Sequence, residues 1–148
     1  MDKHEKITKI IYSFREVNNF FYKQMWHHAN EMGVTVVQLQ ILKLLSQEPN
    51  LSLQELTGKM NISKSTVSST VDRLVKASYI EREQSLTDRR SIVLNLTVLG
   101  KKKEIEGNQL FQKRLKDLND ISDEDTEKLL ELHQLVKEKI NVNGDEQN

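Results

Sequence analysis

Large apolar residues recur at three- and four-residue steps over residues 3–29, which predicts a long amphipathic helix. Its apolar positions are Ile7, Ile10, Ile11, Phe14, Val17, Phe21 and Met25. The helix is expected to end at Met32 and Gly33. The next segment begins at Thr35, a favourable N-cap, and stops at Pro49. Leucine, isoleucine and valine are so dense between them that we predict a buried core helix.

Two shorter helices are predicted next. Ser52 and Glu55 have the spacing of a capping box, which opens a helix that ends near Met60. Asn61 tolerates the left-handed conformation that a tight turn between helices needs, and Ser63 caps another helix that runs to about residue 77.

Beyond this point the apolar residues alternate with polar ones. Residues 80–83 and 91–97 are predicted to be strands, and the polar residues 84–90 between them form the tip of a β-hairpin. Helical spacing returns after Gly100 and extends to Leu118, and Ser122 caps a final helix. Residues 141–148 are expected to fray. The predicted fold class is therefore mainly α with one β-hairpin.

The helix that follows Ser63 has two chemically different faces. The positions predicted to pack inward on this helix and the preceding one are Leu53, Leu56, Met60, Ile62, Val67, Val71, Leu74 and Val75. The opposite face carries small hydroxyls first and charged side chains further along, namely Ser65, Thr66, Ser69, Asp72, Arg73 and Lys76. Hydroxyls and guanidinium groups contact base edges, and a helix N-terminus favours phosphate. This pattern is typical of a helix-turn-helix with a recognition helix, although an ordinary exposed helix also carries serines.

The predicted hairpin strengthens the DNA-binding interpretation, because a hairpin directly after a recognition helix makes a winged helix-turn-helix. Its tip holds Asp88, Arg89 and Arg90. An arginine inserts favourably into a narrow minor groove, and residues two apart on a strand point the same way. Arg90 therefore either enters the groove or is held by Asp88 in a structural ion pair. The lysines at 101–103, expected in the first turn of a helix, are either phosphate ligands or simply solvated.

Composition and charge limit the number of domains and the place where the chain can bind nucleic acid. The chain has 148 residues, 36% hydrophobic and 30% charged, which fits a single domain over 1–148. Basic and acidic residues balance at 22 each, but the segments 1–51, 52–103 and 104–148 carry net charges of +1, +5 and −6. Any affinity for nucleic acid must therefore be local to the middle segment.

Several other classes of protein are not expected. The chain has no cysteine, which excludes disulfides, thiolate-bound metals and thiol chemistry. Its four histidines are expected to be ordinary surface or packing residues, so we predict no metal and no cofactor. No motif of an enzyme is present. Without a long apolar run or a signal peptide, the chain is expected to be cytoplasmic and without a membrane partner.

These motifs resemble the MarR family of bacterial transcription regulators. The matching runs are Thr35-Val36-Val37-Gln38-Leu39-Gln40-Ile41-Leu42, Ile62-Ser63-Lys64-Ser65-Thr66-Val67-Ser68, Val71-Asp72-Arg73-Leu74, Arg82 with Asp88-Arg89-Arg90, and Leu96-Thr97-Val98-Leu99-Gly100. The order and spacing hold over nearly the whole chain. Ser78 departs from the pattern, since the family usually has glycine there. Either Ser78 takes a positive φ or the helix ends differently.

The resemblance implies a homodimer that binds a pseudo-palindromic operator, most often as a repressor released by a small molecule. Residues 34–100 would form the winged lobe, and residues 3–30 and 101–141 the dimerisation helices. The resemblance adds Ser63, Lys64, Ser68 and Arg82 to the candidate DNA-binding residues Ser65, Thr66, Ser69, Arg73, Asp88, Arg89 and Arg90. The alternative function is a winged-helix module that binds only proteins.

A small apolar or aromatic effector is expected near the first helix. Aromatic and methionine side chains gather where this helix approaches the second, and they make adaptable apolar walls. The candidate ligand-binding residues are Phe21, Tyr22, Met25, Trp26 and Met32. His27, His28 or Tyr22 could supply a polar contact. The competing interpretation is that this cluster is simply dimer core.

Overall fold

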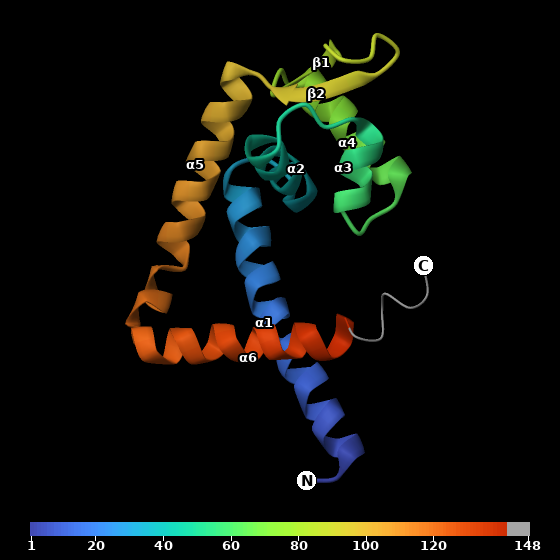
Figure 1. Ribbon diagram of the computed structural model, residues 1–148. Coiled ribbons are helices and arrows are strands. Elements are labelled where there is room, and N and C mark those ends of the chain that lie inside the picture. Colours follow the sequence, from blue (N-terminus) through green and yellow to red (C-terminus); the bar gives the residue numbers. More distant parts are fainter. Residues whose placement is uncertain (142–148) are drawn as a thin grey trace. The chain divides into compact units, whose positions relative to one another are not determined.

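Helices and one hairpin make up the computed structural model, which describes residues 1–141 (Figure 1). The elements in chain order are α1 (Lys3–Glu31), α2 (Val36–Gln47), α3 (Leu53–Lys59), α4 (Lys64–Lys76), β1 (Ile80–Gln84), β2 (Ile92–Leu96), α5 (Val98–Arg114), the 3-10 helix η1 (Lys116–Asp120) and α6 (Asp123–Asn141). The mainly helical fold class with one hairpin is confirmed. The chain divides into two units, with the boundary after Lys113. Fraying was expected of residues 141–148; Asn141 is the last residue of α6, and residues 142–148 lie outside the described residues.

Polar side chains fix where the helices of the first unit begin. The Thr35 hydroxyl accepts a hydrogen bond from the Gln38 amide at 3.1 Å, and the Gln38 side chain accepts one from the Thr35 amide at 2.9 Å. Ser52 and Glu55 make the same reciprocal pair at α3. Ser63 caps α4 by accepting from the Thr66 amide at 3.2 Å. The three predicted helix starts are therefore confirmed, each stabilised by about 1 kcal/mol per cap.

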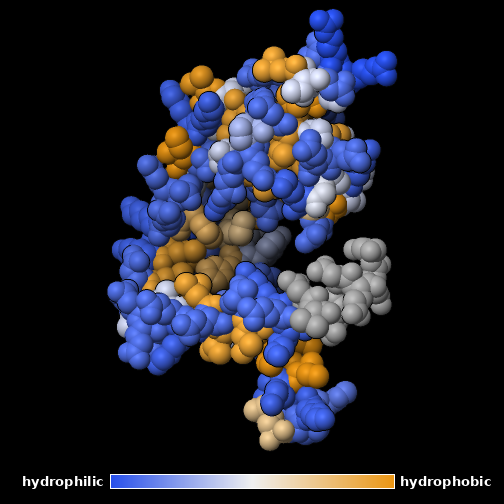
Figure 2. Space-filling model, viewed as in Figure 1, coloured by the Kyte–Doolittle hydropathy of each residue, from blue (hydrophilic) through white to orange (hydrophobic). Residues whose placement is uncertain are grey.

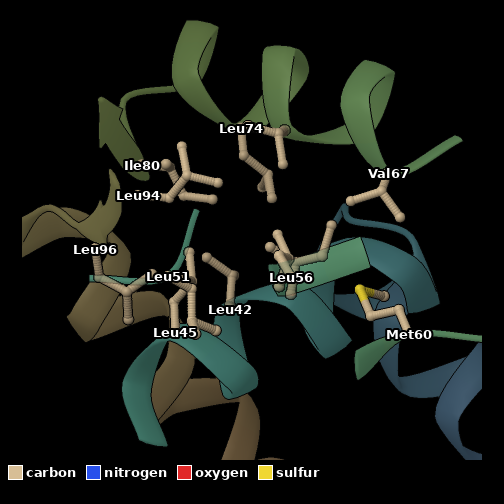
Figure 3. Close-up of a cluster of buried hydrophobic side chains, with 12 residues drawn as sticks. Leu42, Leu45, Leu51, Leu56, Met60, Val67, Leu74, Ile80, Leu94 and Leu96 are labelled. Atoms are coloured by element: carbon tan, nitrogen blue, oxygen red, sulfur yellow. The ribbon is translucent and has the colours of Figure 1, made fainter. Parts of the chain in front are cut away.

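One apolar core lies under α4 (Figure 3). Val67, Val71 and Leu74 follow one another at helical spacing on α4, and each is at most 1% exposed. They pack with residues from α2, α3 and the hairpin, namely Ile41, Leu42, Leu45, Leu51, Leu56, Met60, Ile80, Leu94 and Leu96. Because this stripe is buried, the opposite face of α4 points to solvent. Ile62, which was predicted to pack inward, is 37% exposed, so that prediction was wrong.

The hairpin is attached to the helix-turn-helix through the chain before α3. β1 and β2 pair antiparallel, from Ile80 opposite Leu96 to Gln84 opposite Ile92. Leu51 adds a single bridge on the other side of β2, where the Leu94 amide donates to the Leu51 carbonyl at 2.8 Å. This bridge fixes the hairpin against the start of α3.

The boundaries of α5 differ from the sequence prediction. The helix begins at Val98 rather than after Gly100, because the Thr97 hydroxyl caps it by accepting from the Gly100 amide at 2.9 Å. It also ends at Arg114, and Leu118 lies in η1 instead. The lysines at 101–103 therefore lie beyond the first turn of α5, so the prediction that they occupy the first turn of a helix was wrong.

The turn between α3 and α4 also differs from the prediction. Asn61 does not have a positive φ, whereas Asn50, in the turn before α3, has a φ of 64°. Asn50 is held there by Asn95 of β2. The Asn50 amide donates to the Asn95 side-chain oxygen, and the Asn95 amide group donates to the Asn50 side-chain oxygen, both at 2.8 Å. The left-handed asparagine thus serves the α2–α3 connection.

The second unit contains η1 and α6. Ser122 caps α6 by accepting from the Asp125 amide at 3.1 Å, which confirms the predicted start of this helix. Large apolar residues of α6 are exposed, including Leu129, Leu132, Leu135 and Ile140. None of the helices within residues 1–141 has the length and apolar character needed to span a bilayer.

Ser78 closes α4 in the left-handed conformation, with a φ of 65°. The Ser78 amide donates to the Val75 carbonyl at 3.0 Å, and the Tyr79 amide donates to the Leu74 carbonyl at 2.9 Å. These two bonds form a Schellman motif, which normally places glycine at the left-handed position. Of the two outcomes open for Ser78, the positive φ is confirmed.

Replacing Ser78 with glycine should therefore stabilise the fold. A residue with a Cβ is sterically strained in this conformation, and glycine is not, although it loses more entropy on folding. We expect Ser78→Gly to raise the free energy of unfolding in urea by about 0.5–1 kcal/mol. Ala77→Gly is the control, because Ala77 has a φ of −77° and this change should destabilise the protein instead. Equal destabilisation by both changes would contradict the strain assigned to Ser78.

Candidate nucleic-acid interface

The N-terminal end of α4 presents a connected group of hydroxyls. The Ser63 hydroxyl lies 2.8 Å from that of Thr66 and 3.2 Å from that of Ser65, and the Ser69 hydroxyl donates to the Thr66 carbonyl at 3.1 Å. Lys64, Ser65, Thr66 and Ser69 are exposed, and Ser68 is half-buried. These short side chains leave the backbone of the helix accessible to a partner. The partial positive charge of a helix N-terminus lies at the same end.

Further along the same face the side chains become long and charged. Arg73 and Lys76 lie in the last turn of α4, and both are exposed. A cation there is favoured by the negative end of the helix dipole. The face therefore offers hydroxyl groups at one end and a guanidinium at the other, as the sequence predicted.

Arg82 lies at the junction between this face and the wing. Its guanidinium on β1 forms an ion pair with the Asp72 carboxylate on α4, and both side chains are about half exposed. Exposed pairs of this kind contribute at most about 1 kcal/mol to stability, so the main effect is on geometry. The pair ties the wing to the exposed face of α4, and Arg82 thus has a partner within the protein.

Asp88 shapes the tip of the wing through the main chain. One of its carboxylate oxygens accepts from the Arg90 amide at 3.0 Å, and the other accepts from the Ser91 hydroxyl at 3.0 Å. The Ser85 amide closes the loop by donating to the Ser91 carbonyl at 2.9 Å. Asp88 therefore positions the backbone of Arg90. Arg89 and Arg90 are both exposed, and the tip stands out as a strongly hydrophilic projection in Figure 2.

The base of the wing carries two acidic residues. Glu81 and Glu83 are two apart on β1, so their side chains share one face of the strand. A hydrogen bond that protonated Glu81 donates to the Glu83 carboxylate raises the pKa of Glu81 above its usual value, with burial and the charge of Glu83 adding to the effect and Lys101 opposing it. Glu81 thus holds a proton more tightly than a single exposed glutamate does.

A small cavity of about 140 Å³ lies between α1, α2 and α5. It is lined by Met25, His28, Leu39, Gln40, Lys43, Glu104, Gly107, Asn108 and Phe111. His28 is only 3% exposed, and its Nε2 atom has no hydrogen-bond partner within the described residues. Its ring lies against Phe111, with the centroids 5.7 Å apart. The cavity is therefore mainly apolar, and its wall includes one buried polar atom that has no hydrogen-bond partner within the described residues.

The structure brings only part of the predicted ligand cluster to this cavity. Met25 lines it, and Met32 is buried close to Gly107. Phe21, Tyr22 and Trp26 are exposed, and Trp26 packs edge-on against His27. The contribution of α5 was not predicted. The spacing of Glu104, Asn108 and Phe111 is a helical stripe, but nothing in the sequence says that it faces α1.

Comparison with known proteins decides the family. Residues 34–92, from the start of the α2 segment into β2, match the model of the MarR family. This segment of the chain belongs to the MarR family. Within residues 1–141 no cluster of three or more histidine, aspartate or glutamate side chains could hold a metal ion.

Two curated relatives match longer stretches of the chain. YcgE of Bacillus subtilis, an HTH-type transcriptional regulator, is 33% identical over 104 residues, which are 70% of this chain and 66% of that protein. The HTH-type transcriptional repressor MdtR of the same organism is 34% identical over 77 residues, 52% of this chain and 50% of that protein. The chain thus spans one half to just under two thirds of the length of these relatives.

Solved structures show that the resemblance also holds for the fold. A mutant of MarR from E. coli, crystallised with operator DNA, has a TM-score of 0.74 to this chain at 20% identity. The likeness covers 92% of this chain and 99% of that one. It includes helices outside residues 34–92, so the winged helix-turn-helix fold with flanking helices is confirmed.

Proposed function

We propose that this chain is a sequence-specific DNA-binding transcription regulator, acting as a repressor, in the cytoplasm where it meets DNA. The observation that carries the proposal is the exposed face of α4, where hydroxyls at the N-terminal end are followed by Arg73. MdtR is named a repressor, and the E. coli MarR mutant was crystallised with operator DNA. These likenesses support the same role here.

The chemistry of α4 suits the major groove. A helix fits this groove, where hydroxyls contact base edges and arginine pairs with guanine. Short side chains at Ser65, Thr66 and Ser69 let the backbone come close to the DNA. The helix N-terminus, together with Ser63 and Lys64, favours a phosphate. The recognition surface therefore combines positioning by phosphate with discrimination by base contacts.

The wing suits the adjacent minor groove. Arg89 and Arg90 are held at its exposed tip by the turn that Asp88 organises. A narrow minor groove concentrates negative potential and attracts arginine. The Asp72–Arg82 pair sets the wing relative to α4, so Arg82 contributes by placing the wing and shares its charge with any nearby phosphate.

Charge distribution favours DNA over a protein partner. The alternative, a winged helix that binds only proteins, agrees with the overall neutrality of the chain. It gives no role to the net charge of +5 in residues 52–103 or to the two arginines at the wing tip. A catalytic role is not proposed either, since the relatives are named transcriptional regulators.

We also propose a homodimer. On α1, residues Ile7, Ile10, Ile11, Val17 and Phe20 are each at least 42% exposed, and apolar (orange) side chains are visible at the N-terminal end of this helix in Figure 2. α6 carries a further set of exposed leucines. Stable soluble chains rarely leave such apolar surface uncovered, and a second copy would bury it. Two lobes would then bind half-sites about one DNA turn, ~34 Å, apart.

The cavity beside His28 is the proposed effector site. A volume of about 140 Å³ suits a single aromatic ring, since cavities of about this size bind benzene. The unpaired Nε2 of His28 and the nearby Lys43 would receive a hydroxyl or carboxylate on that ring. Such a ligand would release DNA only if it prefers a lobe spacing that mismatches the operator.

Selection of duplexes from a random pool tests the proposed function. The full-length protein should enrich an inverted repeat, and a mobility shift on that duplex should exceed the shift on scrambled DNA by ~10³-fold or more in affinity. Equal binding to every duplex, or no binding at low salt, would favour the protein-interaction alternative.

Substitutions in the recognition helix and in the wing should have different effects on DNA binding. Arg73→Ala should change which sequences bind, because a base-edge contact contributes ~1–3 kcal/mol. Arg90→Ala should lower the affinity for all selected sequences. It should also make the slope of log K against log salt shallower by ~0.9 for each phosphate that the variant no longer neutralises. Arg15→Ala, an exposed arginine on α1, is the control. An unchanged affinity and slope in Arg90→Ala would refute the role of the wing.

The apolar face of α1 should be required for the dimer. Ile11→Glu places a charge in the proposed interface, where burial without a partner is costly, and should shift sedimentation at micromolar concentration towards the monomer. Asn19→Glu adds the same charge at an exposed polar position of the same helix and should leave the dimer intact. A wild-type protein that sediments as a monomer would overturn this proposal.

An aromatic ligand should depend on His28. Salicylate and a panel of phenols and aromatic carboxylates are added to the protein–DNA complex, with fluorescence of Trp26, the sole tryptophan, reporting binding. We expect at least one compound to release DNA, and His28→Phe to weaken binding of that compound about 2- to 10-fold, the net contribution of one hydrogen bond. His27→Phe, an exposed neighbour, should have no effect. A panel that changes neither signal would remove the effector from the proposal.

A further inference from the structure

Thr97 lies between the hairpin and α5, at a point where the chain also meets the end of the recognition helix. Its hydroxyl donates a hydrogen bond to the Ser78 carbonyl at 2.6 Å and accepts one from the Gly100 amide at 2.9 Å. The Thr97 amide donates to the Tyr79 carbonyl at 3.1 Å. One residue thus joins the C-terminal end of α4 to the first turn of α5.

Gly100 makes this junction close. A Cβ atom added at Gly100 would lie 2.0 Å from the Tyr79 carbonyl oxygen and 2.9 Å from its carbon. Both are backbone atoms, which cannot rotate away as a flexible side chain would. Glycine is therefore required here for the backbones of α5 and the α4–β1 connection to approach each other.

The end of α4 is itself fixed at the same place. Ser78 and Tyr79, whose carbonyls receive the bonds from Thr97, are the residues whose amides close α4 in the Schellman motif. A shift of the first turn of α5 would therefore pull on the last turn of α4. This arrangement differs from an ordinary N-cap, such as Thr35 on α2, whose side chain bonds only within its own helix start.

We propose that Thr97 and Gly100 form a latch that sets the direction of α5 relative to the recognition helix, with Thr97 as a positioning residue for DNA binding. The consequence for DNA rests on the proposed function, whereas the latch itself does not. The competing interpretation is that Thr97 only caps α5. The two interpretations differ in whether removal of the Thr97 hydroxyl loosens the end of α4 as well as the start of α5.

Hydrogen–deuterium exchange of the full-length protein without DNA separates them. Thr97→Val removes the hydroxyl and keeps the shape, and Thr97→Ser restores the hydroxyl. In Thr97→Val the latch predicts exchange about 10-fold faster both at the start of α5 and at the amides of residues 77–79, as expected when the hydrogen bonds of one hydroxyl are removed. Thr97→Ser should exchange like the wild type. Thr35→Val, the matched control, should affect only the start of α2.

Faster exchange confined to the first turn of α5 in Thr97→Val would overturn the latch and leave a local cap. Failure of Thr97→Ser to restore slow exchange would also overturn it, because the hydroxyl would then not be the cause. Gly100→Ala provides an independent perturbation that retains the hydroxyl and should loosen the same two segments. If Gly100→Ala does not fold, the Thr97 variants still decide the question.

DNA binding tests the positioning role separately. On the duplex selected by the wild type, Thr97→Val should bind about 10-fold more weakly with the salt slope unchanged, because its phosphate ligands are intact, and Thr97→Ser should bind like the wild type. Unchanged affinity in Thr97→Val would overturn the positioning role while leaving the latch. If the wild type selects no duplex, the proposed function and with it the positioning role fail, and exchange still decides the latch.

Discussion

The burial of Val67, Val71 and Leu74 under α4 sets the geometry of the whole winged lobe. These three residues form one stripe and are in effect removed from solvent, so α4 has a single orientation on α2, α3 and the hairpin. Full burial of each side chain contributes about 1.5–3 kcal/mol. The exposed hydroxyl and arginine face follows from this packing, because it is the part of α4 that the core does not use.

Polar contacts then fix the neighbouring segments relative to α4. The Asp72–Arg82 pair connects α4 to the wing, and the Asn50–Asn95 pair connects the wing to the chain before α3. Lys103 of α5 donates to the carbonyl of Met32 at 3.1 Å, just after the end of α1. Each contact is weak alone, but together they hold the surface of the lobe in one geometry. Lys103, which belongs to a run of three lysines, therefore has a structural role.

Local signals in the sequence predicted most of the winged lobe. Thr35, Ser52, Ser63 and Ser122 cap helices as predicted, because a cap depends on residues only three positions apart. Ser78 takes the positive φ because the Schellman bonds determine it. The exposed face of α4 followed from its apolar stripe. Periodicity predicted the flanking helices, and the family resemblance added only the expectation that they form a dimer.

Features that depend on contacts distant in sequence were not predicted. The start of α5 was misplaced because Thr97 was assigned to a strand, although its hydroxyl caps the helix. The left-handed asparagine is Asn50 rather than Asn61 because Asn95, 45 residues away, holds it. The cavity beside His28 needs α1 and α5 to be adjacent, which no periodicity reveals.

We propose that DNA contacts both the exposed face of α4 and the tip of the wing. This contact can be observed directly in solution. Amide chemical shifts of the isotope-labelled protein, recorded as the selected duplex is added, report which residues meet the DNA. We expect the largest changes on residues 63–76 and 87–90, with α1 largely unaffected. Large changes centred on α1 or α6, with residues 63–76 unmoved, would contradict this interface.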